Sequence, residues 1–130
     1  MKILEAGENY LETIYILSKR NKTVRSIDIA NEMNYSKPTI SVAMKQFREN
    51  GYIKMDDNGY ITLTDKGLEI ALRIYERHQI IAEFLMAIGV DEETAFDDSC
   101  KMEHHISQKS FECLKSFYLN NKEKIASQHN

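Results

Sequence analysis

The sequence predicts a mainly α-helical protein with one small β-hairpin, which begins with an N-terminal winged helix-turn-helix and continues as a helical C-terminal domain. Two capped helices separated by a tight turn lie between Ser26 and Gly51, and alternating residues flank the pair Asn58-Gly59 shortly afterwards. Beyond this pair, apolar residues recur with helical spacing almost to the end of the chain. These observations give the expected order of elements: helices, then two strands, then helices again.

Length and composition set the class of protein. The chain has 130 residues and a mass of 15.1 kDa, which suffices for one domain or two small ones. No charged and apolar leader opens it, and its longest apolar stretch, residues 80–90, contains Glu83 and is too short to span a bilayer. Two cysteines, Cys100 and Cys113, make no disulfide framework. We therefore expect a protein of the reducing cytoplasm with no membrane partner.

The first predicted helix runs from Glu5 to Lys19. Its apolar stripe contains Leu11 and Ile14, and Asn9 and Glu12 lie about one turn apart at the edge of that stripe. Their amide and carboxylate oxygens therefore lie on neighbouring turns.

The helix-turn-helix follows. Ser26 can cap a short helix, and Asn34 suits the left-handed conformation that would end it. Ser36 can cap the next helix, with Pro38 tolerated in its first turn and Gly51 closing it. Two short helices joined by a tight turn make the motif.

The second of these helices separates an apolar face from a polar one. The residues expected to pack inward are Ile40, Ala43, Met44 and Phe47, and those expected to face outward are Lys37, Ser41, Val42, Lys45 and Arg48, with Thr39 on the flank. Small hydroxyls with cations on an exposed face suit the major groove of duplex DNA. Ser36 and Thr39 could also serve only as helix caps.

Charge is distributed unevenly along the chain. Between Lys19 and Lys54 there are eight basic and three acidic residues, a net +5, in a chain whose formal net charge is -3. The remaining residues therefore carry -8. A basic segment in an acidic protein indicates a local polyanionic partner, and the alternative is a solvated positive face with no ligand.

A hairpin is predicted directly after the second helix of the helix-turn-helix. In that position it would form a wing and make a second contact with DNA. Asn58-Gly59 is a strong signal for a two-residue hairpin turn. Asp56 and Asp57 near the tip disfavour a phosphate contact there, so Lys54 is the better candidate. The full set of expected DNA-binding residues is Arg25, Ser36, Lys37, Pro38, Thr39, Ser41, Lys45, Arg48 and Lys54.

From a cap at Thr64 to Ile88 the pattern predicts one long helix, ended by Gly89. It has two apolar faces, and two faces need two partners, most simply the chain's own domain and a second copy of the chain. His78 lies in one of these stripes, where a lone histidine is more often a hydrogen-bonded core residue than a ligand. The residues expected at the dimer interface are Ile81, Phe84, Ile88, Phe111 and Leu114.

Asp91 starts another predicted helix, which carries Cys100, Glu103 and His104 at positions i, i+3 and i+4 of one face. A thiol, a carboxylate and an imidazole can all ligate a metal ion, but a site needs more donors than one turn supplies. The alternative is a solvated face beside a small buried cysteine. A last helix begins near Ser107. The expected domains are the winged helix-turn-helix over 1–64, a helical metal-binding and dimerisation domain over 65–120, and a polar tail over 121–130.

The layout resembles one known family over most of the chain, from Glu8 to about Tyr118. The segments that carry the likeness are residues 9–15 (NYLETIY), 36–41 (SKPTIS), 63–67 (LTDKG), 77–78 (RH) and 100–105 (CKMEHH). Together they are similar to the diphtheria-toxin-repressor and manganese-transport-regulator family of metal-dependent bacterial repressors, in a short form lacking the SH3-like C-terminal domain.

The resemblance implies a homodimer in which a metal ion ties the first helix to the two helices after the wing. Carried over by position, the ligands are Asn9, Glu12, His78, Cys100, Glu103 and His104. Glu12 resembles the manganese type and Cys100 the iron type, whereas Asn9 offers only an amide oxygen, a weaker ligand than a carboxylate. Ala82 and Phe96 stand near positions of ancillary ligands in iron-type members, which argues against a second site of that kind.

The implied function is a metal-dependent transcriptional regulator of metal homeostasis, acting as a repressor on a palindromic DNA operator. The implied effector is Fe(II) or Mn(II), one or two ions per subunit, with Cys100 placing Fe(II) narrowly first; Zn(II), Co(II) or Ni(II) could bind in vitro. The alternative is a metal-independent winged-helix repressor sensing a small organic ligand. A metalloenzyme is disfavoured because no His-Glu-x-x-His or nucleophile motif is present, so no small-molecule substrate is expected.

Overall fold

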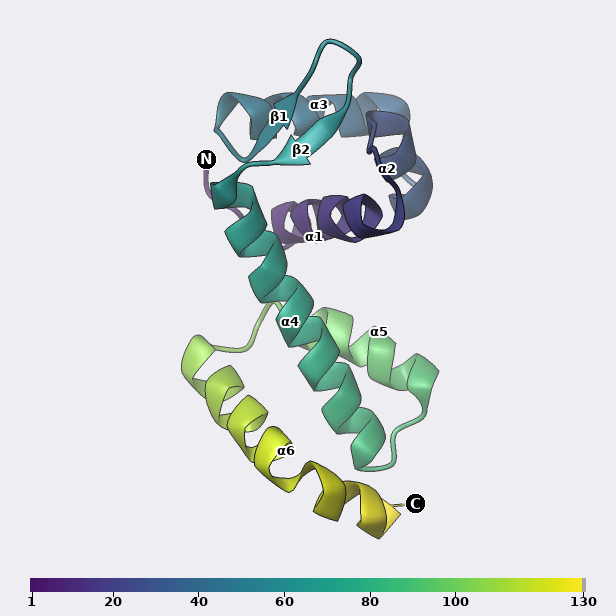
Figure 1. Cartoon of the computed structure of the whole chain (residues 1–130), viewed down its shortest axis with the longest axis vertical. Helices are drawn as coiled ribbons and strands as arrows, with labels where there is room; N and C mark the ends of the chain where they lie inside the picture. The colour runs from purple at the N-terminus through teal and green to yellow at the C-terminus, as the bar shows by residue number, and fades with distance from the viewer. Residues whose placement is uncertain (130) are drawn as a thin grey trace. The chain divides into compact units, whose positions relative to one another are not determined.

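The computed structural model describes the backbone of residues 1–129, and the side chains of all of these except 126, 128 and 129 (Figure 1). Within this range the elements are α1 (Glu5–Arg20), α2 (Ser26–Met33), α3 (Lys37–Glu49), β1 (Ile53–Met55), β2 (Ile61–Leu63), α4 (Asp65–Ala87), α5 (Glu92–Met102) and α6 (Gln108–His129). The predicted fold class, mainly α with a small hairpin, is confirmed. None of the helices in this range combines the length and apolarity needed to cross a bilayer.

The chain divides into two compact units, unit 1 (Met1–Arg73) and unit 2 (Ile74–Asn130), and α4 contributes residues to both. In unit 1, α1, α2, α3 and the hairpin enclose one apolar core. Its most deeply buried side chains are Leu11, Ile14, Ile29, Ile40, Met44, Phe47 and Ile53. Because this core takes one whole side of α3, the opposite side of α3 is left for solvent or for a partner.

The caps of the helix-turn-helix agree with the sequence except at Ser26. Ser36 Oγ accepts a hydrogen bond from the Thr39 amide at 3.3 Å, and Asn34 has φ 57°, the left-handed conformation predicted for it. The residue at the N-cap of α2 is Arg25, whose amide donates to Asp28 Oδ2 at 2.8 Å. The predicted Ser26 cap is therefore wrong. The Asp28 carboxylate takes over the role, because a negative charge is favoured in the first turn of a helix.

The hairpin turn is displaced by one residue from the predicted Asn58-Gly59 position. The Gly59 amide donates to the Asp56 carbonyl at 3.0 Å, so Asp57 and Asn58 are the central residues, and Gly59 follows with φ 81°. Asp56 Oδ1 accepts from the amides of both Asn58 and Tyr60 at 2.9 Å. This aspartate fixes a longer loop than the Asn-Gly pair alone would form.

Unit 2 has its own core, formed by the C-terminal half of α4 together with side chains of α6. The buried apolar residues are Ile80, Ile81, Phe111, Tyr118 and Ile125. Asp91 caps α5 as predicted, since its Oδ2 accepts from the Thr94 amide at 3.0 Å. The segment predicted as a polar tail is helical instead, because α6 continues to His129 and places Ile125 in the core.

Two of the residues predicted for a dimer interface are already buried within the chain. Ile81 is 0% exposed and Phe111 2%, both in the core of unit 2, so neither is available to a second copy. Phe84 and Leu114 are half-buried against the same core, and Ile88 is exposed. The amphipathic pattern was correct, but the sequence did not show that α6 would cover the second apolar face of α4.

The start of α4 packs closely against the end of α3. Thr64 Oγ1 accepts from the Gly67 amide at 3.2 Å and donates to the Gly51 carbonyl at 2.6 Å. A Cβ added at Gly67 would lie 2.1 Å from the carbonyl oxygen of Tyr52. Only glycine fits at this position of the helix.

We therefore expect Gly67→Ala to lower the free energy of unfolding of unit 1, although Ala is intrinsically favoured over Gly in a helix by about 1 kcal/mol. Urea unfolding followed by circular dichroism should show a loss of more than about 1 kcal/mol. The matched control is Glu69→Ala on the exposed surface of the same helix, which should change stability little. A Gly67→Ala variant as stable as the parent would contradict the close approach.

Candidate metal centre and nucleic-acid interface

Three side chains of unit 2 converge on the ring of His78. His78 Nδ1 lies 2.9 Å from Glu103 Oε2, 3.1 Å from Ser99 Oγ and 3.5 Å from Cys100 Sγ. The possible ligand atoms of His78, Cys100 and Glu103 all lie within 4.8 Å of one another. His104 completes the group, with Nε2 3.2 Å from Glu103 Oε1.

The contacts in this cluster are concentrated on one atom, His78 Nδ1. A histidine nitrogen carries at most one proton, yet three polar atoms point at the same nitrogen. Glu103 is 0% exposed, and its Oε1 has no hydrogen-bond partner among the residues that the structure describes. A buried carboxylate that lacks full pairing is costly, and a cation among these atoms would satisfy it. The residues present therefore fit a metal ion.

The environment of His78 changes its acidity. Its contact with Cys100 and its hydrogen bond to Glu103 raise the pKa of the ring to about 10, against the desolvation that lowers it. Without a metal the ring thus keeps its proton at neutral pH and donates to Glu103. A protonated nitrogen cannot ligate, so coordination at Nδ1 requires that proton to leave.

The set of donors is chemically mixed. It joins imidazole nitrogen from His78 and His104, carboxylate oxygen from Glu103 and thiol sulfur from Cys100. Oxygen and nitrogen donors suit Mn(II) and Fe(II), and a sulfur donor shifts preference toward Fe(II), Co(II), Ni(II) or Zn(II). Cys100 is exposed whereas Glu103 is fully buried, so the cluster has an open side at the thiol.

Arg77, the neighbour of His78, anchors the segment that follows α5. Its Nη1 donates to the carbonyls of Glu103 at 3.0 Å and Ile106 at 2.8 Å, and its Nη2 donates to Gln108 Oε1 at 2.7 Å. The side chain is buried, and its guanidinium lies over the Phe111 ring. Arg77 therefore fixes the backbone that carries Glu103.

Arg77 was predicted only as part of a motif, without a role, and Ser99 was not predicted as part of the site. Neither residue type signals a metal site by itself. Ser99 is fully buried one position before Cys100, and only the folded arrangement shows that its hydroxyl reaches His78. A second difference is that α5 ends at Met102, so Glu103 is the C-cap and His104 lies in the turn after the helix.

The two ligand candidates of the first helix lie in unit 1. Glu12 is buried at 8% exposure, which is unusual for a glutamate, and Asn9 is half-buried. Both are on α1. The ligand role of each remains a prediction.

The predicted DNA-binding residues all lie on the surface of unit 1. The exposed members are Arg25, Ser36, Lys37, Pro38, Thr39, Ser41, Lys45, Arg48 and Lys54. Arg25 also stacks on the Tyr60 ring, with its guanidinium carbon 4.6 Å from the ring centroid, and this stacking ties the start of α2 to the wing. These cations and hydroxyls are accessible to a polyanion.

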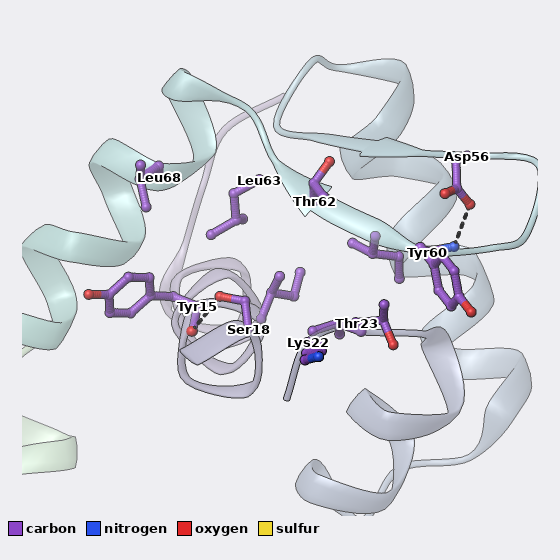
Figure 2. A pocket seen from close by; sticks show the side chains of 12 residues that line it. Tyr15, Ser18, Lys22, Thr23, Asp56, Tyr60, Thr62, Leu63 and Leu68 are labelled. Atoms are coloured by element: carbon purple, nitrogen blue, oxygen red, sulfur yellow. Dashed lines mark hydrogen bonds between the residues drawn. The ribbon is translucent and has the colours of Figure 1, made fainter. Parts of the chain in front are cut away.

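Unit 1 also contains a hollow of about 470 Å³ under the wing (Figure 2). It is mainly apolar, and two of the polar groups that line it already bond the backbone. The Ser18 hydroxyl donates to the Tyr15 carbonyl at 2.7 Å, and Asp56 Oδ1 accepts from the Tyr60 amide. The polar groups of Ser18 and Asp56 are therefore already engaged, unlike Oε1 of the Glu103 carboxylate.

Two family models match the chain. A model of the iron dependent repressor N-terminal DNA binding domain matches residues 2–61, and a model of the iron dependent repressor metal binding and dimerisation domain matches residues 64–126. An HTH-type transcriptional regulator of Methanocaldococcus jannaschii is 35% identical over 120 residues, which cover 91% of this chain and 96% of the relative. The chain belongs to the iron-dependent repressor family.

The chain is also similar to other metal-responsive regulators. The transcriptional regulator MntR of Salmonella typhimurium is 34% identical over 113 residues, 87% of this chain and 72% of the relative. The solved manganese regulator SloR matches with a TM-score of 0.75 and 30% identity over 92% of this chain and 55% of its own. The apo form of the manganese-activated repressor ScaR matches with a TM-score of 0.73 and 27% identity, over 84% and 52% respectively. The chain thus spans about half the length of these solved regulators.

Membership of the iron-dependent repressor family settles the class of function. The chain is a metal-responsive DNA-binding transcriptional regulator and not an enzyme, because the relatives are transcriptional regulators. The family therefore does not favour a metal-independent repressor that senses an organic ligand.

We expect Glu103→Gln to weaken metal binding by a hundredfold or so, because loss of an outer-shell partner alone costs about 10- to 100-fold. The amide keeps the size of the side chain but removes its charge. Calorimetric titration with Mn(II) would measure the change. The matched control is Glu93→Gln, at an exposed glutamate in the first turn of α5, which should bind metal as the parent does. Equal affinities in the two variants would exclude Glu103 as a ligand.

Arg77→Lys should affect both stability and metal affinity. Lysine cannot reproduce the forked contacts, so we expect unit 2 to lose roughly 2 kcal/mol of stability. Metal affinity should fall about tenfold because Glu103 is less well positioned. Thermal unfolding and calorimetry measure the two effects separately. Arg73→Lys, whose ion pair with Glu8 is half-exposed, provides the control on the same helix. Reduced stability with unchanged affinity would refute the positioning role.

Proposed function

We propose that the chain is a repressor of metal-ion homeostasis genes, which binds a palindromic DNA operator as a homodimer in the cytoplasm when Fe(II) or Mn(II) is bound. The observation that supports this most strongly is the fully buried Glu103 carboxylate, which lies beside three side chains that could ligate a metal ion, those of His78, Cys100 and His104. A cluster of this kind in a DNA-binding regulator suits the sensing of a cation.

We propose His78, Cys100, Glu103 and His104 as the ligands of unit 2, with Glu12 and more weakly Asn9 contributing from α1. The burial of Glu12 supports this assignment, because a glutamate side chain is seldom buried unless it serves a specific interaction. A bound divalent ion would supply the positive charge that these groups require. His78 would bind through a deprotonated nitrogen, and Arg77 would hold Glu103 in place.

Metal preference follows from the donors. Cys100 favours Fe(II) over Mn(II), although the manganese regulators SloR and ScaR are close structural neighbours. ScaR has also been solved with Zn²⁺ and with Cd²⁺. Binding in vitro therefore does not by itself identify the effector, since Zn(II) outranks Fe(II) and Mn(II) in intrinsic affinity.

On the DNA side, we propose that α3 enters the major groove and that Lys54 on β1 contacts the backbone beside it. The exposed hydroxyls near the start of α3 and the cations Lys45 and Arg48 support this docking. In a dimer the two recognition helices would read half-sites about one helical turn apart, or a multiple of that spacing.

The test is metal-dependent binding of duplexes selected by the protein from a randomised 30-base-pair library. Fluorescence anisotropy with free Fe(II), Mn(II), Zn(II), Co(II) and Ni(II) held at defined concentrations should show tightest binding with Fe(II), followed by Mn(II). At a hundredfold excess over its Kd the ion contributes about 2.7 kcal/mol, so affinity for DNA should rise by up to about a hundredfold.

Chelation provides the opposite measurement. After thorough removal of metal, the same duplex should be bound weakly and in a salt-dependent, sequence-independent manner. A chelated protein that binds its selected duplex as tightly as the loaded one would refute the proposed function. Activation by Mn(II) alone would reverse the proposed order of metals but leave the mechanism intact.

A further inference from the structure

The outward face of α3 has an apolar residue at its centre. Ile40, Met44 and Phe47 define the buried side of this helix, at 0% to 1% exposure. With a rotation of about 100° per residue, the line directly opposite passes close to Pro38, Val42 and Glu49, at i, i+4 and i+11, with Lys45 to one side of it. Val42 is therefore the residue of the middle turn that points farthest from the core.

The exposure of Val42 is large for an aliphatic side chain. It is 60% exposed, and among the large exposed apolar residues described in unit 1 only Leu4, at 62%, is more exposed; Met1 follows at 54%, and both of these lie near the N-terminus. Ile27 and Tyr35 are less exposed, at 39% and 49%. Val42 is not part of the core of unit 1 and remains exposed on this face. A single exposed valine is common on protein surfaces, but here it lies among exposed hydroxyls and cations.

We propose that Val42 reads thymine in the operator by packing against the C5-methyl group in the major groove. This inference rests on the proposed function and deepens it. The C5-methyl is the apolar group that the major groove presents, and an aliphatic side chain is the matching partner. Valine can neither donate nor accept a hydrogen bond, so its contribution to specificity is restricted to this contact.

The neighbouring residues favour such a contact. The exposed Ser41 stands immediately before Val42, and Lys45 lies one turn farther along the same face. Contacts from Lys45 and Arg48 to phosphates would position the helix without reading sequence, since phosphate contacts fix register but carry no base information. A short, stiff side chain such as valine requires close approach of the helix to the base edges, and Val42 lies in the N-terminal half of α3, the part that reads bases in helix-turn-helix proteins.

The test is a deoxyuridine scan of a duplex selected from the randomised library by the full-length, metal-loaded protein. Each thymine is replaced singly by deoxyuridine, which removes only the methyl group and retains the pairing. We expect the parent to lose about fourfold in affinity at one or more positions per half-site, the effect of one buried methyl group. In Val42→Ala the same replacements should have no effect. Val42→Thr, which keeps the shape and one methyl, should show an intermediate penalty.

Lys45→Gln is the matched control on the same face of α3. It should bind every duplex more weakly, with a salt dependence reduced by about one unit, yet keep the deoxyuridine penalty. A parent protein that is insensitive at every thymine, or a Val42→Ala variant with the same penalties as the parent, would overturn the inference and leave the proposed function standing. Failure of the loaded protein to select any duplex would overturn both.

Discussion

The arrangement of unit 2 depends on one unbalanced interaction, the buried carboxylate of Glu103 against the ring of His78. Glu103 is fully buried with one oxygen on His78 and the other beside His104. A carboxylate in such a place is costly unless positive charge accompanies it. The raised pKa of His78 favours a protonated ring, which would provide that charge when no metal is bound. In the proposed metal-bound form a divalent ion would provide it more fully, because it would also engage Cys100 and His104.

Arg77 holds the backbone beside the cluster independently of the candidate ligand atoms. Its fork holds the carbonyls of Glu103 and Ile106, so the backbone after α5 is fixed by hydrogen bonds that do not involve the ligand atoms. Two adjacent residues of α4 thus have different roles. Arg77 holds the backbone after α5, and the ring of His78 contacts the Glu103 carboxylate. A preformed cluster loses less conformational entropy when it binds an ion, which leaves more of the binding energy for shifting the protein toward its DNA-binding state.

Local signals were sufficient to predict most of the helices and their caps, since Ser36, Thr64 and Asp91 each act within four residues. They also placed Cys100, Glu103 and His104 together, because these residues are neighbours in sequence. What the sequence could not show depends on long-range packing. Burial of Ile81 and Phe111 required knowing that α6 covers α4, and the hydroxyl of Ser99 has meaning only beside a histidine 21 residues away. The turn after β1 was predicted one residue too late, because the hydrogen bonds that the Asp56 carboxylate accepts from the Asn58 and Tyr60 amides determine its position.

The uneven distribution of charge limits the affinity of the protein for DNA in the absence of a metal. Residues 19–54 carry a net +5, whereas the rest of the chain carries -8. Negative charge elsewhere in the chain repels DNA, so non-specific attraction is weaker than the basic segment alone would produce. With low background binding, a gain of about a hundredfold on metal binding can decide whether an operator is occupied. Sequence must then be read by contacts that do not add general affinity. A short apolar side chain on the outermost line of α3 meets this requirement, because it distinguishes bases without strengthening attraction to phosphate.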